Sequence, residues 1–294
     1  MDIQLSILQF FQSLRSGVLD TLFLILTIST EIPVIVLLTT IMYWCINKKY
    51  GQKILFSLVG NVAINSGIKD IIKAKRPIGI EGIVSQRVST ATGYSFPSGH
   101  TQTATSFWTS IIIIFKNTWI SIIGAIIILG VGISRLYLGV HWPIDVIFGW
   151  GFGIIFTVIF SKFFDYVDNE KKYLSLVLML IPFTLVAFLV NSSSYIKSFG
   201  LLTGFVLGYI VEDRYIQFET ISKNKNKINF SNKKGNKIAK NIFRFLLGII
   251  TLGLVYLGLK YTMPSNNLFD YIRYTIVVFY GVCGVPFLFK IFKL

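Results

Sequence analysis

The chain has two histidines among its 294 residues, and each stands beside residues that suit nucleophilic or acid–base chemistry. His100 ends the run Ser95-Phe96-Pro97-Ser98-Gly99-His100, and His141 is followed four positions later by Asp145. Residues spaced i, i+4 share one face of a helix, so Asp145 can meet His141 on a helix that begins near Trp142. A carboxylate beside an imidazole fixes its tautomer and stabilises its protonated form, as a catalytic histidine requires. A purely structural His–Asp pair is the alternative.

Three cations near predicted helix ends accompany the histidines: Lys69, Arg76 and Arg135. The planar fork of an arginine binds phosphate through two hydrogen bonds, whereas a lysine contributes a point charge. Arg135 is the most informative of the three, because residues 129–138 are otherwise uncharged and an arginine at the membrane edge is a candidate functional residue. Taken alone, Lys69 has a simpler explanation as a side chain reaching toward the membrane interface, and Arg76 as a charged loop residue.

The tripeptide Pro97-Ser98-Gly99 predicts the start of a helix. The free N–H groups at a helix start attract anions, and a glycine there lets the backbone approach a ligand. An ordinary serine cap accounts for Pro97 and Ser98. It does not account for His100 in the first turn of a membrane helix, so we interpret the whole run as a phosphate-binding segment.

Membrane helices are the elements that must position these residues. The composition is 53% hydrophobic and only 14% charged, whereas soluble domains carry about a quarter charged residues. A span needs ~20 mostly apolar residues, which predicts an all-α, polytopic bundle of about nine transmembrane helices. They cover residues 20–45, 53–72, 99–115, 119–138, 143–161, 173–190, 196–211, 242–259 and 268–289. Glu31 and Pro33 interrupt the first, so two shorter helices meeting at Thr30 are the alternative.

The hydropathy pattern also predicts how the chain is divided. Residues 1–14 form an amphipathic surface helix that belongs to a membrane core at 1–211. A hydrophilic, basic loop follows at 212–241, and residues 242–294 form a two-helix extension. Cys45 and Cys283 both lie in apolar runs, which favours two buried thiols over a disulfide or a metal site.

Lysine and arginine positions predict which side of the membrane each motif faces, because cytoplasmic loops are enriched in them. One side of the predicted bundle collects eighteen of the 28 bases: seven between residues 48 and 172, nine from Arg214 to Arg244, and Lys290 and Lys293. That side is expected to be cytoplasmic, so the histidine motifs face the other way. The loop 212–241 is then a solvated surface or one attracted to anionic lipid headgroups. Its bases lack interleaved aromatic residues, so we expect no nucleic-acid partner.

Taken together, the motifs resemble those of the type-2 phosphatidic acid phosphatase superfamily. They are Lys69 with Arg76-Pro77, Pro97-Ser98-Gly99-His100, and Ser134-Arg135 with His141 and Asp145. Every defining position matches, over about a quarter of the chain. The N-terminal portion is also similar in organisation to the glucose-6-phosphatase branch, with an aromatic pair at Tyr43-Trp44 and Asn65 before Lys69.

The resemblance implies a helical core of about six spans and a role for each motif residue. His141 attacks phosphorus and carries the phosphoryl group, Asp145 orients and activates it, and His100 protonates the leaving oxygen. The phosphate-binding set is Lys69, Arg76, Ser98, Gly99 and Arg135. The resemblance also implies that neither a metal ion nor an organic cofactor is required.

The sequence thus predicts a lipid phosphatase or diphosphatase of a bacterial plasma membrane, acting at the extracytoplasmic face. Undecaprenyl diphosphate, phosphatidate and phosphatidylglycerol phosphate are candidate substrates. A soluble sugar phosphate, or transfer of the phosphoryl group to an alcohol, would use the same residues. A non-catalytic lipid-binding or lipid-moving protein is the third possibility. The connection 78–96 either covers the site as a lid or is a plain surface loop, and the sequence does not predict an oligomeric state.

Overall fold

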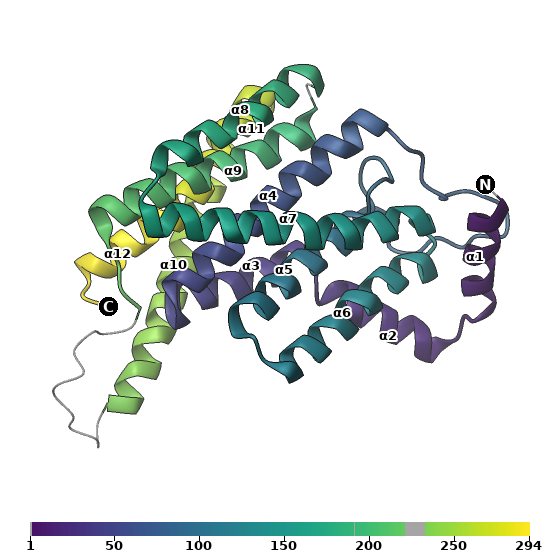
Figure 1. Ribbon diagram of the computed structural model, residues 1–294, viewed down its shortest axis with the longest axis horizontal. Helices are drawn as coiled ribbons and strands as arrows, with labels where there is room; N and C mark the ends of the chain where they lie inside the picture. Colours follow the sequence, from purple (N-terminus) through teal and green to yellow (C-terminus); the bar gives the residue numbers. More distant parts are fainter. Residues whose placement is uncertain (1, 191, 221–232) are drawn as a thin grey trace. The chain divides into compact units, whose positions relative to one another are not determined.

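The computed structural model describes residues 2–190, 192–220 and 233–294, and these residues form helices and connections without any strand (Figure 1). The predicted all-α fold is therefore confirmed. The α-helices are α1 (Asp2–Ser13), α2 (Gly17–Ile28), α3 (Ile32–Ile41), α4 (Lys48–Ile72), α5 (Gly99–Phe115), α6 (Thr118–Tyr137), α7 (Pro143–Glu170), α8 (Tyr173–Val190), α9 (Ser193–Val211), α10 (Lys233–Thr262), α11 (Asn267–Phe279) and α12 (Val285–Ile291). Short π or 3-10 turns are η1 (Met42–Ile46), η2 (Val88–Thr90), η3 (Glu212–Ile216) and η4 (Tyr280–Gly284).

Within the described residues, seven helices are long and apolar enough to cross a membrane. They are α4, α6, α7, α8, α9 with η3 (Ser193–Ile216), the part Ile238–Thr262 of α10, and α11 to α12 (Asn267–Ile291). The α1–α2 pair, bent by 117°, would add an eighth if it counts as one span. The other two predicted spans correspond to α5, which has 17 residues, and to the α2–α3 region.

The single first span predicted over residues 20–45 is wrong, and the alternative of two helices is confirmed. α2 ends at Ile28 and α3 begins at Ile32. Pro33 explains the break, because it has no N–H to donate to the preceding turn and its ring clashes there. The hydroxyl of Thr30 instead donates to the carbonyl of Thr27 at 3.2 Å.

Other helices extend beyond the predicted spans, α4 and α7 among them. α4 begins five residues before residue 53, and α7 continues nine residues past residue 161. Hydropathy marks where an apolar run ends, but a helix continues while its polar residues find partners. Here two ion pairs join these extensions, Lys49 to Asp168 at 2.7 Å and Lys53 to Asp165 at 2.6 Å.

The chain forms two compact units. Unit 1 comprises Met1–Val36 and Gly60–Phe164, and unit 2 comprises Leu37–Val59 and Asp165–Leu294. α4 and α7 each contribute residues to both. The boundaries predicted at residues 211 and 241 stay predictions, and residues 221–232 of the predicted basic loop lie outside the described residues.

Glycines on α7 set the packing of unit 1 around the start of α5. A Cβ atom on Gly153 would lie 2.6 Å from Cβ of Thr105, and one on Gly149 would lie 3.1 Å from the carbonyl oxygen of Ser98. Small residues spaced four apart let two membrane helices approach closely. As a result, the first turn of α5 lies directly against the first turns of α7.

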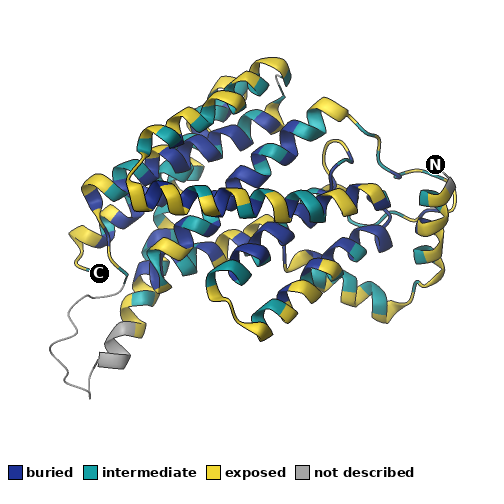
Figure 2. Ribbon diagram, viewed as in Figure 1, coloured by how far each residue is buried: buried dark blue, intermediate teal, exposed yellow. Residues whose placement is uncertain are grey.

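Unit 2 is built in a similar way on α9. Cβ atoms on Gly200 and Gly204 would lie 2.7 Å and 2.4 Å from carbonyl oxygens of α11. By contrast, α8 is exposed or half-buried along its length, and Leu176 is its one buried residue (Figure 2). An apolar helix with an exposed surface fits a lipid environment. The aromatic pair noted in the sequence packs within this unit, since Tyr43 donates a 2.6 Å hydrogen bond to the carbonyl of Val282.

The predicted N-terminal surface helix is present as α1 and packs on unit 1. Leu8 is fully buried against Ile83, Leu136 and Val146. Ile3, on the opposite face, stays exposed. α1 therefore has one apolar face on the protein and another that is free for lipid.

Candidate active site

All eight predicted site residues belong to unit 1, where four segments of the chain supply them. In chain order these are the end of α4 and the connection after it, the start of α5, the end of α6, and the connection 138–142 with the first turn of α7. The end of α4 and its connection carry Lys69 and Arg76, and the start of α5 carries Ser98, Gly99 and His100. The end of α6 carries Arg135, and the connection 138–142 with the first turn of α7 carries His141 and Asp145. The structure brings these residues together, either through direct contacts or through interactions between their charges.

His141 and Asp145 meet as their spacing predicts. Nδ1 of His141 lies 3.2 Å from Oδ2 of Asp145, and both side chains are buried. The same oxygen accepts hydrogen bonds from the backbone N–H of Trp142 at 2.8 Å and from the hydroxyl of Ser95. An ionised carboxylate only accepts, so we assign the proton of the neutral ring to Nδ1. Nε2 then carries the lone pair that a nucleophilic histidine needs.

Arg76 occupies the other side of the His141 ring. Its Nη1 lies 2.9 Å from Nε2 of His141 and also donates to the carbonyl of Val140. The remaining N–H groups donate to three carbonyls of the connection, those of Thr92, Gly93 and Tyr94. All five N–H donors of this arginine are thus engaged. Arg76 both orients the lone-pair nitrogen of His141 and holds residues 92–94.

Lys69 is held by the same connection. Its Nζ donates to the carbonyl oxygens of Tyr94 at 2.6 Å and Ser95 at 3.1 Å. A Cβ atom on Gly99 would lie 3.9 Å from Cε of Lys69. The lysine therefore lies beside the first residue of α5, with one of its three N–H donors not used in these two bonds.

Arg135 is the most deeply buried of the three cations, with 0% of its surface exposed. Nη1 donates to the hydroxyl of Thr27 at 2.7 Å, whereas Nε and Nη2 have no hydrogen-bond partner. A buried donor without an acceptor costs about 1–3 kcal/mol, and more when the group is charged. An anion that accepts from these two nitrogens would remove that cost.

The start of α5 also differs from an ordinary capped helix. Ser98 occupies the N-cap position, but its side chain makes no capping hydrogen bond. Its hydroxyl instead accepts from Thr101 at 2.9 Å, and its N–H donates to the carbonyl of Asp145 at 2.9 Å. The serine-cap explanation of this residue is wrong. The first turn of α5 is tied to the His141–Asp145 pair through the backbone.

Two regions of the chain match known families. Residues 51–168 match the family model described as the PAP2 superfamily, and residues 196–294 match the one described as PAP2 superfamily phosphatase, transmembrane extension. The chain belongs to the PAP2 superfamily. The first match contains every predicted site residue, and the second covers α9 to α12, whose length and composition make this an integral membrane protein.

Individual relatives match shorter stretches. The chain is 31% identical to an undecaprenyl-diphosphatase of Sulfolobus acidocaldarius over 36% of this chain and 51% of that protein. It is 26% identical to sphingosine-1-phosphate phosphatase 1 of Rattus norvegicus over 46% of this chain and 34% of that protein. The crystal structure of Aquifex aeolicus LpxE is similar with a TM-score of 0.49 and 22% identity, covering 54% of this chain and 95% of that one. The chain spans about half the length, or less, of these curated relatives.

Three contributions to the site of this PAP2 superfamily member were missed in the sequence. Ser95 stands inside the His100 motif, and its contact with Asp145 depends on how the connection folds back. Thr27 and Glu31 come from the end of α2 and just beyond it, and Glu31 forms an ion pair with Arg87. A polar residue within an apolar run was the available signal, and for Glu31 we read it only as an interruption of a span.

Burial and nearby charges determine the protonation of the residues outside the spans. Burial lowers the pKa of His141 well below its ordinary value of 6.5, and the charges of Lys69, Arg76 and Arg135 lower it further. Burial likewise lowers the pKa of Arg76, although Asp145 opposes this. His141 is therefore neutral at neutral pH, in the form that can attack phosphorus.

The described residues contain no group of three or more His, Cys, Asp or Glu side chains placed to hold a metal ion. The PAP2 site instead gathers cations and a histidine–carboxylate pair around one position. Such a set stabilises the negative charge that spreads over a phosphoryl group in its transition state.

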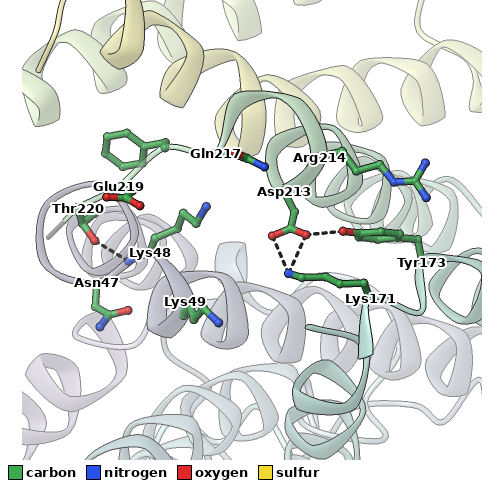
Figure 3. A pocket seen from close by; sticks show the side chains of 11 residues that line it. Asn47, Lys48, Lys49, Lys171, Tyr173, Asp213, Arg214, Gln217, Glu219 and Thr220 are labelled. Atoms are coloured by element: carbon green, nitrogen blue, oxygen red, sulfur yellow. Dashed lines mark hydrogen bonds and ion pairs between the residues drawn. The ribbon is translucent and has the colours of Figure 1, made fainter. Parts of the chain in front are cut away.

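A second polar region lies in unit 2, where a pocket of about 650 Å³ opens between η3, the 217–220 segment and the start of α4 (Figure 3). None of the predicted site residues lines it. Nζ of Lys171 lies 2.8 Å from Oδ2 of Asp213, which also accepts from the hydroxyl of Tyr173 at 2.5 Å. Arg214 lies over the Tyr173 ring, 4.4 Å from its centre. These side chains largely satisfy one another.

Proposed function

We propose that this PAP2 superfamily member hydrolyses a phosphate ester or diphosphate of a membrane lipid, without a metal ion, through a phosphohistidine intermediate. One arrangement carries the proposal: a buried His141 with its lone pair on Nε2, close to a buried Arg135 that has two donors without acceptors. A histidine without an anion-binding partner would support only a structural role. The combination fits a phosphoryl group placed between the two residues.

In the proposed reaction, Nε2 of His141 forms a bond to phosphorus as the bond from phosphorus to the leaving oxygen breaks. The bonding electron pair leaves with that oxygen, and His100 supplies its proton. Asp145 stabilises the positive charge that develops on the His141 ring. Water then attacks the phosphohistidine, which releases inorganic phosphate and restores neutral His141.

The relatives include an undecaprenyl-diphosphatase and a sphingosine-1-phosphate phosphatase, which supports a lipid phosphate as the substrate class. Undecaprenyl diphosphate, phosphatidate and phosphatidylglycerol phosphate are the candidates to test. Exposed apolar side chains on α2, among them Val18 and Leu22, lie on the helix that also carries Thr27. A lipid tail can pack on such a surface while its headgroup reaches Arg135.

We also propose that the site faces away from the cytoplasm of a bacterial plasma membrane. The unequal distribution of lysine and arginine between the two predicted sides supports this orientation. The test uses Glu81→Cys and Lys172→Cys, both at exposed positions, and a membrane-impermeant maleimide on intact cells. Labelling of Glu81→Cys alone is expected. Labelling of Lys172→Cys alone would reverse the orientation.

The direct test is phosphate release by the purified protein in detergent with EDTA present. The panel holds the three lipids and glucose 6-phosphate, with His141→Ala as the control. Release from a lipid, lost in the variant and unchanged by EDTA, is expected. Release from glucose 6-phosphate alone would assign a soluble substrate, products phosphorylated on an added alcohol would indicate phosphotransfer, and no release from a folded protein would favour lipid binding without turnover.

A further inference from the structure

Arg87 brings a fourth cation to the site, although no motif contains it. It lies in the connection between α4 and α5, just before η2, and forms an ion pair with Glu31. Its backbone is in the left-handed region, with φ of +53°, which is uncommon for a residue other than glycine. The ion pair with Glu31 holds the side chain of Arg87.

One short segment holds both Arg87 and Arg135. Thr27 accepts the hydrogen bond from Arg135, and Glu31, four residues later, pairs with Arg87. The two guanidinium groups therefore converge on the turn after α2. Their charges interact with each other, and the charge of Arg87 also acts on His100.

A second set of contacts fixes the backbone beside Arg87. The hydroxyl of Ser85 donates to the carbonyl of Gly139 at 2.8 Å, and the N–H of Gln86 donates to that of Leu138 at 3.0 Å. Gly139 has a φ of +64° and leaves no room for a side chain, because a Cβ atom there would lie 3.0 Å from the carbonyl oxygen of Val84. Residues 84–86, which directly precede Arg87, are therefore attached to the turn before His141.

Arg87 also keeps an unused donor inside the protein. Its Nε is buried without a hydrogen-bond partner, as are Nε and Nη2 of Arg135. Glu31 engages only Nη2 of Arg87. The two arginines thus offer three buried N–H-bearing nitrogens without acceptors.

We propose that Arg87 binds the second phosphoryl group of a diphosphate ester, an inference that rests on the proposed function. This contact would make the site selective for diphosphates over monophosphates. Glu31 is the positioning residue that orients Arg87. In this reaction Nε2 of His141 bonds to the terminal phosphorus, and the bond from that phosphorus to the bridging oxygen breaks. The bridging oxygen keeps the electron pair and leaves as part of a lipid monophosphate.

The location of Arg87 favours this assignment over a general phosphate contact. In the proposed reaction the leaving group lies next to His100, and Glu31 holds Arg87 at the turn after α2, close to Thr27, which accepts from Arg135. The leaving group of a monophosphate ester is an alcohol, which gains little from a nearby cation. The leaving group of a diphosphate ester is a phosphate that keeps its negative charge, which an arginine fork can bind.

The test compares undecaprenyl diphosphate with undecaprenyl phosphate, which share one lipid tail. Arg87→Gln is expected to lower the ratio of kcat/KM for the diphosphate over the monophosphate by about tenfold or more, the effect of losing a charged hydrogen bond. Arg87→Lys should restore part of the ratio, and Glu31→Gln should lower it less than Arg87→Gln does. Arg15→Gln is the matched control, because Arg15 also holds this connection, through the carbonyl of Val84. It should change both activities by the same factor.

Measurements of binding distinguish the role of Arg87 from the proposed hydrolytic function. Calorimetry on the full-length protein in detergent measures the affinities for methylenediphosphonate and for inorganic phosphate. Arg87→Gln should lower the ratio of these affinities, diphosphonate over phosphate, by the same factor as the ratio of kcat/KM. A changed binding ratio in a protein without turnover would reject hydrolysis and keep the role of Arg87. The role of Arg87 would be overturned if Arg87→Gln left the preference for diphosphate over monophosphate unchanged in both binding and turnover. It would also be overturned if Arg15→Gln lowered that preference as much as Arg87→Gln does. Neither result would argue against hydrolysis.

Discussion

Two sets of positive side chains, one in each unit, are held in opposite ways. In unit 2, Lys48, Lys49 and Lys171 each contact a carboxylate at 2.7–3.0 Å. In unit 1, the three motif cations Lys69, Arg76 and Arg135 donate to carbonyls, a hydroxyl and a histidine. Within the described chain, none of these three is in salt-bridge distance of a carboxylate.

This difference separates charge that stabilises the protein from charge kept for a ligand. A buried charge without a counter-charge costs folding free energy, and a partner carboxylate offsets part of that cost. Unit 2 supplies the partner within the chain, most completely at Glu212, which is fully buried and accepts from Lys48, Gln52 and the N–H of Phe218. The three motif cations of unit 1 have no carboxylate in salt-bridge distance, and under the proposed function the phosphate of the substrate supplies that counter-charge.

Replacing Arg135 should have the largest effect and should affect activity only. Arg135→Gln is expected to lower kcat/KM for lipid phosphate about 10³- to 10⁵-fold, the range for an arginine that stabilises phosphoryl transfer. Its unfolding midpoint should stay the same or rise, because a buried charge without a carboxylate partner is removed. A fall in stability with activity retained would show that Arg135 stabilises the fold, as the paired lysines of unit 2 do.

Replacing Glu212 is the converse experiment. Glu212→Gln keeps the size of the side chain but places an amide among donors, and it leaves Lys48 without its counter-charge. We expect a loss of about 3–5 kcal/mol in the free energy of unfolding, as for other broken buried pairs. Denaturant unfolding in detergent measures this. Activity per folded molecule should remain, and a selective loss of turnover would mean that unit 2 also takes part in the chemistry.

Phosphate itself should distinguish the two units. Inorganic phosphate at a hundred times its Kd is expected to stabilise the native protein by about 2.7 kcal/mol. The thermal shift should disappear in Arg135→Gln and persist in Glu212→Gln. An equal shift in both variants would show that phosphate binds somewhere other than the cations of unit 1.

The protonation of His141 gives a pH prediction. Because its pKa lies below 6.5, the neutral nucleophile persists on acidification until the pH falls below that value. The acid limb of kcat/KM that reports His141 should therefore lie below pH 6.5, with about a tenfold loss for each further pH unit. Arg76→Gln removes a neighbouring positive charge and should move this limb upward. A downward shift would contradict the electrostatic explanation.

The smallest effect is expected at the edge of the unit 2 pocket. Lys171 is half-exposed and pairs with Asp213 (Figure 3). It also pairs with Asp168. Exposed ion pairs contribute about 0–1 kcal/mol, so Lys171→Met should lower the free energy of unfolding by no more than that. Phosphate release should not change. A large loss of activity would show that this pocket has a role that its paired charges do not indicate.

The fold was predictable where the polarity of the sequence changes sharply. The bounds of α5 and α8 agree with the predicted spans at both ends, because an apolar run, a turn and a new run follow one another there. α4 and α7 extend further because their charged ends pair with each other, as in Lys53 with Asp165. Pairing between residues so distant in sequence leaves no local pattern.

The site was predictable to the same extent. The spacing of His141 and Asp145 predicted their contact, because only three residues separate them where the connection 138–142 enters the first turn of α7. The ion pair of Glu31 with Arg87 joins residues 56 positions apart. It depends on the break at Pro33 and on the path of the connection after α4, neither of which has a periodic signal.

The complete set of hydrogen bonds around Arg76 has a consequence for turnover. A phosphate that binds this arginine has to displace its hydrogen bonds to carbonyls or to His141. The new hydrogen bonds therefore replace existing ones, and their number does not increase. Inorganic phosphate, the last product, is subject to the same exchange when it leaves. Under the proposed function, the carbonyls and His141 compete with the product for Arg76, and we expect this exchange to favour release of phosphate.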